Sequence, residues 1–125
     1  MRPINAVLVH HDAAAAEGLA ASLRNQFRNL VVAKSVEEAR SALMRLHAQF
    51  VVADLELISL AELKQLCSTF PAAAFVCIHR LADDRMWSEA LAMGAVDCCY
   101  SSDVRGILLA SERYVVLSHK SSAAA

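Results

Sequence analysis

The sequence predicts an α/β domain of five βα units, in which a parallel five-stranded sheet is covered by helices on both faces. Short apolar runs of strand length alternate strictly with stretches of helical periodicity, which is the pattern of βαβ units. The runs are solid Val, Ile, Leu and Ala, as expected of strands buried on both faces. A length of 125 residues fits one such doubly wound domain.

The first unit begins with a strand expected over residues 5–10, and a helix follows it. Asp12 is placed to cap the N-terminus of this helix. The apolar positions of the helix recur on one face, and they are Ala16, Leu19, Ala20, Leu23 and Phe27. A second strand is expected over about residues 30–33.

The second and third helices both begin at a capping-box pattern, S-x-x-E. Ser35 with Glu38 opens the second helix, and Ser59 with Glu62 opens the third. The buried positions expected of the second helix are Val36, Ala39, Leu43 and Leu46. Between these helices, residues 50–53 form the third strand, which ends at Asp54.

Proline at position 71 is expected to stop the third helix near Phe70. The fourth strand covers about residues 74–78. Asp83 or Asp84 caps the fourth helix, which runs to Gly94, a residue suited to a left-handed C-terminal cap.

The fifth strand covers about residues 96–100, and Ser102 or Asp103 opens a fifth helix that continues to about Leu117. Residues 119–125 show no apolar period, so we expect a tail or the start of a linker. The predicted domain therefore covers residues 1–118.

Composition excludes several classes of function. A net charge of −1 without a basic stripe argues against direct nucleic-acid binding. Apolar runs of about seven residues are too short to span a membrane, and the N-terminus lacks a signal peptide, so a cytoplasmic location is expected. The three glycines form no dinucleotide fingerprint and no nucleophile elbow is present, so we expect no enzyme activity.

The four cysteines are expected to be core residues. They form no C-x-x-C pair, and three of them lie in expected buried strands, which favours packing over redox or zinc roles. Adjacent Cys98 and Cys99 point to opposite faces of a strand, so a disulfide between them is not expected.

Residues able to carry chemistry follow four of the expected strands: His10 and His11, Asp54, His79, and Ser101. Ligands of an open parallel sheet gather beyond the carboxyl ends of its strands. We therefore expect Asp54 to lie beside two or three histidines.

Three stretches carry a resemblance to a known family: Val7–Asp12, Val51–Leu57, and the E-A-L-x-x-G-A-x-D run of Glu89–Asp97. On these stretches the chain resembles the receiver domains of two-component response regulators over nearly its whole length. The resemblance implies a flavodoxin-like three-layer sandwich with strand order 2-1-3-4-5. It also implies bacterial two-component signal transduction or a phosphorelay, in which a kinase histidine donates a phosphoryl group to an aspartate.

The resemblance implies Asp54 as the phospho-acceptor, but the residues that support the reaction in the family differ here. The family has an acidic pair for Mg²⁺ after strand one, Ser or Thr after strand four, and Lys followed by Pro after strand five. The corresponding residues in this chain are His10 and His11 with Asp12 beyond, His79, Ser101 and Ser102, and Cys98 replaces an aromatic switch residue.

Because Mg²⁺ prefers oxygen ligands, we expect weak or absent Mg²⁺ binding and no ordinary phosphorylation. The chain then acts as a pseudo-receiver that contacts another signalling protein or effector domain, or forms a homodimer, through the fourth helix, fifth strand and fifth helix. Arginine and aromatic anchors are available there, and they are Arg85, Met86, Trp87, Arg105, Arg113 and Tyr114. Equally, Trp87 and Tyr114 can simply pack at the edge of the core.

Two alternatives stay open. In one, a histidine kinase phosphorylates Asp54, and histidinium at position 11 or 79 replaces the lysine. In the other, a transition metal binds among His10, His11, His79 and Asp54. Because adjacent strand residues point apart, His10 and His11 are not expected to bind one ion together. The expected metal ligands are therefore His11, Asp54 and His79.

The plainer expectation for this cluster is that one histidine pairs with Asp54 while the others take backbone partners. A histidine beside a carboxylate also predicts a response to pH near neutrality. His47 and His119 are expected to be solvated residues at helix ends.

Overall fold

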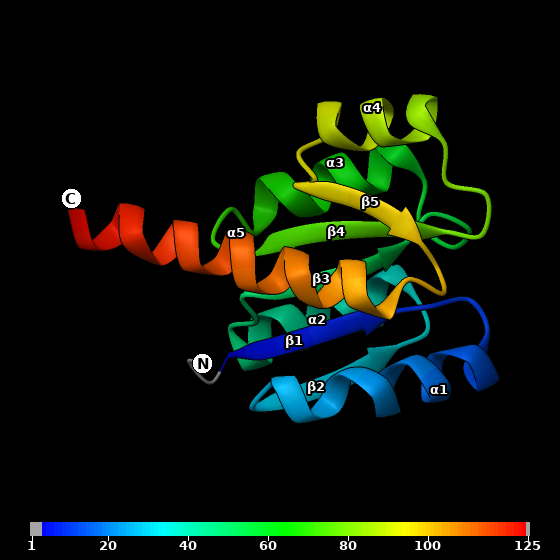
Figure 1. Cartoon of the computed structure of the whole chain (residues 1–125), viewed down its shortest axis with the longest axis horizontal. Helices are drawn as coiled ribbons and strands as arrows, with labels where there is room; N and C mark the ends of the chain where they lie inside the picture. Colours follow the sequence, from blue (N-terminus) through cyan, green and yellow to red (C-terminus); the bar gives the residue numbers. More distant parts are fainter. Residues whose placement is uncertain (1–3, 125) are drawn as a thin grey trace.

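The structure, a computed structural model, describes residues 4–124, and side chains as far as Tyr114. Five strands and five α-helices alternate along the chain (Figure 1). The strands are β1 Asn5–Val9, β2 Asn29–Ala33, β3 Phe50–Asp54, β4 Ala74–His79 and β5 Asp97–Tyr100. The helices are α1 Ala13–Leu23, α2 Val36–Leu46, α3 Leu60–Thr69, α4 Asp84–Ala92 and α5 Val104–Ala124, with a 3₁₀ turn, η1, at Arg24–Gln26.

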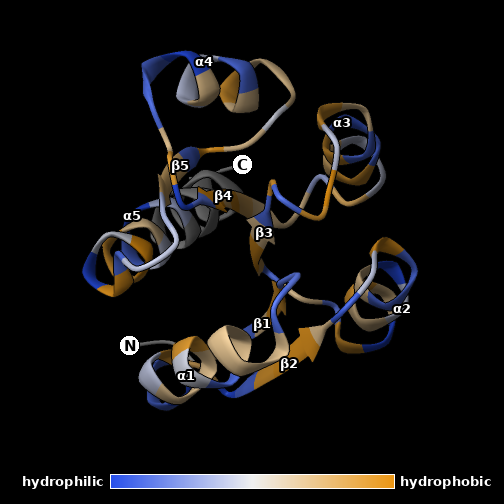
Figure 2. Cartoon of the chain, turned by 90° about the vertical axis from the view of Figure 1, so that its right-hand side faces the viewer, coloured by the Kyte–Doolittle hydropathy of each residue, from blue (hydrophilic) through white to orange (hydrophobic). Residues whose placement is uncertain are grey.

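The strands form one parallel sheet in the order β2-β1-β3-β4-β5. Helices α1 and α5 cover one face of the sheet, while α2, α3 and α4 cover the other (Figure 2). This is the predicted flavodoxin-like arrangement. Because the order reverses after β1, the switch point of the sheet lies between β1 and β3, where a crevice is expected.

Each face of the sheet has its own apolar core. On the α1 and α5 side, Leu8 and Phe50 pack with Ile107, and the rings of Phe27 and Phe50 stack at 5.7 Å. On the other side, Phe75 packs in a cluster with the α3 residues Leu63 and Leu66. Each fully buried side chain of this size contributes about 1.5–3 kcal/mol, so these two layers hold the strand ends in place.

Local signals set most helix ends. Ser59 and Glu62 form the complete capping box of α3, and Asp83 caps α4. At α2 the Ser35 hydroxyl accepts the N–H of Glu38 as predicted, but the Glu38 carboxylate accepts the N–H of Lys34 instead of that of Ser35. At the end of α4 the predicted left-handed residue is present, since Gly94 has φ +114°.

Three boundaries differ from the expectation. β1 ends at Val9, one residue early, so His10 belongs to the connection to α1. Phe27 is buried as predicted, but it follows the turn η1 instead of continuing α1. The backbone of α5 continues through Ala124, well past Leu117, so the expected tail is helical from residue 119 to 124. The His119 side chain lies outside the described residues.

None of the helices in residues 4–124 combines the length and the apolar character that crossing a membrane requires.

Candidate functional site

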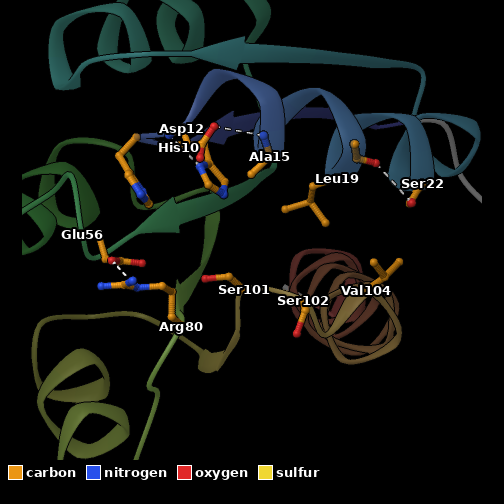
Figure 3. Close-up of a pocket in the computed structure, with 12 residues that line it drawn as sticks. His10, Asp12, Ala15, Leu19, Ser22, Glu56, Arg80, Ser101, Ser102 and Val104 are labelled. Carbon is orange, nitrogen blue, oxygen red and sulfur yellow. Dashed lines mark hydrogen bonds and ion pairs between the residues drawn. The ribbon is translucent and has the colours of Figure 1, made fainter.

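The carboxyl ends of β1, β3, β4 and β5 meet at one edge of the sheet and form a pocket of about 500 Å³ (Figure 3). Its polar end is lined by residues from the strand ends, and its apolar end lies between α1 and α5. The lining includes His10, His11, Asp12, Ala15, Gly18, Leu19, Ser22, Glu56, Arg80, Ser101, Ser102 and Val104.

Asp54, the last residue of β3, is completely buried and contacts His11, which lines the polar end of the pocket. Its Oδ2 atom accepts hydrogen bonds from the backbone N–H of His11, at 2.9 Å, and from the His11 ring nitrogen Nδ1. Its Oδ1 atom accepts the N–H of Glu56 at 2.9 Å. Both carboxylate oxygens are therefore in use, and the His11 ring lies against the one nearer to the β1–α1 connection.

His10 lies beside this pair. Its Nδ1 atom is 3.6 Å from Asp54 Oδ2 and accepts the N–H of Asp12 at 3.0 Å. The two imidazoles stack with their centroids 5.1 Å apart and their planes 19° apart. The expectation that adjacent histidines point apart was wrong, because β1 ends at Val9 and strand alternation does not extend to these residues.

His79, the last residue of β4, does not join the pair. Its Nδ1 atom accepts the N–H of Leu81 at 2.9 Å. Among the described residues, the cluster of potential metal ligands contains His10, His11 and Asp54 but not His79. One histidine thus pairs with Asp54 while the other two take backbone partners, which was the plainer of our expectations.

The His11–Asp54 contact shifts both groups toward their charged forms. Burial of Asp54 acts to raise its pKa, but the hydrogen bonds from His11 and Glu56, with His10 nearby, outweigh burial and hold the pKa below its ordinary value. The hydrogen bond to Asp54 is the main cause that raises the pKa of His11, and the charges of Asp54, Glu56 and Asp12 add to it. Both shifts favour an imidazolium–carboxylate pair.

Asp12 has a structural task at the rim of the pocket. Its Oδ1 atom accepts the N–H groups of Ala14 and Ala15, at 3.0 and 3.2 Å, and so caps α1 as predicted. Negative charge at a helix N-terminus also interacts favourably with the helix dipole. The Asp12 carboxylate is therefore already hydrogen-bonded to the first turn of α1.

Sequence reasoning missed a second ion pair at this edge. Arg80 Nε lies 2.9 Å from Glu56 Oε1, which joins the connection after β3 to the connection after β4. The Glu56 Oε2 atom is buried and has no hydrogen-bond partner among the described residues. The signal available was position alone, since Glu56 and Arg80 each follow shortly after the end of a central strand.

The hydroxyl-bearing residues Ser101 and Ser102 line the pocket opposite His10 (Figure 3). Ser101 follows β5, and its backbone N–H donates to the His79 carbonyl at 3.2 Å. Ser101 stands where the resemblance leads one to expect a lysine, so the residue that follows β5 here carries a hydroxyl and no charge. Arg80 is the arginine that lines the pocket.

The predicted interface residues lie on α4 and α5. Trp87 is 45% exposed, and its indole N–H donates to Asp97 Oδ1 at 3.1 Å. Tyr114 is partly buried against the core, with the Arg113 guanidinium 5.7 Å from its ring centre. Arg105 is exposed, while Arg85 pairs with Glu89. Packing at the core edge therefore describes Tyr114 better than Trp87.

Two more features match expectations drawn from the sequence. The four cysteines are free, and burial raises the pKa of Cys67 and Cys98 to about 11 and that of Cys99 to about 12. Thiols held protonated in this way are poor nucleophiles and poor ligands. His47 is exposed and ends α2 with a left-handed φ of 51°.

No protein-family model matches this sequence, and no curated protein matches it significantly. Solved structures do match, among them a signal receiver domain of a putative Luxo repressor protein from Vibrio parahaemolyticus. That match has a TM-score of 0.84 at 10% identity and covers 98% of each chain. A response regulator from Thermotoga maritima matches with a TM-score of 0.80 at 18% identity, over 92% of this chain and 99% of that chain.

A longer protein, NtrX from Brucella abortus, matches with a TM-score of 0.86 at 18% identity, over 98% of this chain and 29% of that chain. All these identities are low, so the similarity establishes the fold. The chain has the fold of response regulator receiver domains.

Proposed function

We propose that this chain is a pseudo-receiver, a signalling module that acts through protein contacts and without ordinary Mg²⁺-dependent phosphorylation of Asp54. The receiver fold supports a place in signal transduction. The observation that carries the proposal is the state of Asp54, which is fully buried with both carboxylate oxygens accepting hydrogen bonds.

Burial opposes the chemistry of an acceptor aspartate. A carboxylate that attacks phosphorus needs a free lone pair and an approach path along the line of attack. Here the His11 ring and its backbone N–H both donate to the Oδ2 atom of Asp54, and the N–H of Glu56 takes one lone pair of the Oδ1 atom. A phosphoryl donor would have to displace His11 and leave a buried carboxylate without its partner, which is costly.

The residues at this edge do not fit Mg²⁺, the ion that receiver chemistry implies. Mg²⁺ demands hard oxygen ligands in octahedral geometry. His10 and His11 offer nitrogen where oxygen is needed, and the Asp12 carboxylate caps α1. The donor chemistry of the site therefore argues against Mg²⁺.

Stabilising charge is also lacking. Phosphoryl transfer relies on fixed cations that neutralise the equatorial oxygens. Ser101 follows β5 where the family has lysine, and the guanidinium of Arg80 is paired with Glu56. The site is thus poor in free positive charge.

We assign partner contacts to the surface formed by α4, β5 and α5. Large apolar side chains are exposed there, with Trp87 at 45%, Tyr100 at 55% and Leu109 at 55%. Exposed aromatic residues are typical anchors of protein interfaces. β5 is also an edge strand of the sheet, so this surface can receive another signalling protein, an effector domain or a second copy of the chain.

The alternative is phosphorylation of Asp54 by a histidine kinase. One observation favours it: the charged His11 supplies a cation in contact with Asp54. In that case His11 would move from the carboxylate to the incoming phosphoryl oxygens.

Intact-mass spectrometry after incubation with acetyl phosphate and Mg²⁺ tests the proposal. We expect no phosphoryl adduct that depends on Asp54, so neither the chain nor its Asp54→Asn variant should gain the mass of a phosphoryl group. An adduct on the chain that is absent from Asp54→Asn would overturn the proposal and establish the alternative.

A further inference from the structure

We propose that His10, His11 and Asp54 bind a divalent transition-metal ion of the Zn²⁺, Co²⁺ or Ni²⁺ class. One potential ligand atom from each residue lies within 4.8 Å of the others. His10 and His11 are adjacent in the β1–α1 connection, and Asp54 ends the neighbouring strand β3. The site thus joins two segments that are 43 residues apart in the chain.

The donor set selects the kind of ion. Two imidazole nitrogens and one carboxylate oxygen suit transition metals, whereas Mg²⁺ and Ca²⁺ prefer oxygen alone. Metal–nitrogen distances of about 2.0–2.1 Å place tetrahedral ligands about 3.3 Å from one another. The His10 Nδ1 and Asp54 Oδ2 atoms are 3.6 Å apart, so only small side-chain movements are needed at this pair.

Metal binding would exchange two existing hydrogen bonds for coordination. The proton that His11 Nδ1 shares with Asp54 Oδ2 would leave, and the metal would bridge the two groups. His10 Nδ1 would release the N–H of Asp12, which lies at the rim of the pocket. Asp12 is exposed, so water can take over that N–H.

The pocket leaves the metal accessible on its remaining side. A site with two histidines and one carboxylate keeps positions open for water or a ligand. The pocket of about 500 Å³ provides the space, and Glu56 also lines it. The Glu56 Oε2 atom, buried beside this pocket, has no partner within the described part of the chain.

Metal binding is independent of the proposed lack of phosphorylation, because calorimetry and phosphoryl-adduct mass report on different events. The full chain, stripped with a chelator and dialysed to pH 7.5, is titrated with Zn²⁺ in a calorimeter, and Co²⁺ binding is followed by visible absorption. We expect one ion per chain, a Co²⁺ spectrum with nitrogen ligation, and no displacement by excess Mg²⁺.

Variants identify the ligands. His10→Ala and Asp54→Asn should each weaken Zn²⁺ binding by about tenfold or more, while His79→Ala and His47→Ala should leave it unchanged. Circular dichroism checks that each variant is folded. If Asp54→Asn unfolds, Zn²⁺ binding by His10→Ala tests the proposal alone, because this variant leaves the His11–Asp54 pair in place. Absence of a Zn²⁺ heat, or binding unchanged in folded His10→Ala, overturns the proposal.

Discussion

At the scale of the residue, the contact between His11 and Asp54 determines what this edge of the sheet can do. The same ring that closes the carboxylate to a phosphoryl donor also carries one of the two nitrogens of the proposed metal site. In the metal-free protein it is an ion pair with a buried acidic partner. Its contribution to stability should therefore depend on pH.

The pH dependence has a definite sign. The raised pKa of His11 makes its stabilisation complete below the ordinary value of 6.5 and lost as pH rises through the folded-state pKa. The lowered pKa of Asp54 makes its stabilisation present above the ordinary value of 3.8 and lost as pH falls through the folded-state pKa. The pair should stabilise most between these two ordinary values.

Urea unfolding in chelator checks this expectation. The free energy of unfolding of the chain, minus that of His11→Gln, should be largest near pH 5.5 and should shrink toward pH 9. Glu56, Asp12 and His10 also face the pair, so the comparison is made at constant salt. His79→Gln serves as the control for loss of an imidazole at a strand end. A difference that is flat from pH 5.5 to 9 would contradict the prediction.

At the scale of the element, two glycines with opposite surroundings show how local geometry sets stability. Gly18 lies within α1, and a Cβ atom added there would meet nothing within 4 Å. Gly94 follows α4 with φ +114°, and a Cβ atom there would lie 2.8 Å from the Cβ atom of Cys67. The first glycine costs helix stability, whereas the second permits a turn.

Alanine substitutions at these positions should therefore act in opposite directions. Gly18→Ala should raise the free energy of unfolding by about 0.5–1 kcal/mol, because glycine in a helix is that much less favourable than alanine. Gly94→Ala should lower it by about 2 kcal/mol or more, because alanine is strained at positive φ and must displace Cys67. Urea unfolding at pH 7 measures both, and equal signs for the two variants would refute this account.

At the scale of the whole molecule, the parallel sheet and its two helical layers were predictable because they follow from local patterns, whereas the strand order was implied by the resemblance to receiver domains. Apolar runs such as Phe50–Ala53 and caps such as Ser59 are read from neighbouring residues. The arrangement of His10 and His11 was not predictable, because it depends on β1 ending at Val9 and on contacts with Asp54 across 43 residues. The Glu56–Arg80 pair was missed for the same reason.

The exposed aromatic surface over α4 and β5 predicts self-association of the entire domain. Sedimentation equilibrium should show a dimer that the double variant Trp87→Ala, Tyr100→Ala weakens about tenfold or more, because aromatic anchors dominate interfaces. Met44→Ala is the matched control, since Met44 is 63% exposed on α2. A chain that stays monomeric at every concentration, or a dimer unaffected by the double variant, would exclude a second copy as the partner.

The connection between β1 and α1 is only three residues long, and each of them is engaged. His10 accepts the N–H of Asp12, His11 holds Asp54, and Asp12 holds the first turn of α1. Because the connection is short and all three residues make hydrogen bonds, a displacement of its backbone is passed on to the elements at its ends. We therefore expect a displacement that also breaks the hydrogen bond from the His11 backbone to Asp54 to shift the first turn of α1, so that an event at the crevice alters the outer surface of that helix.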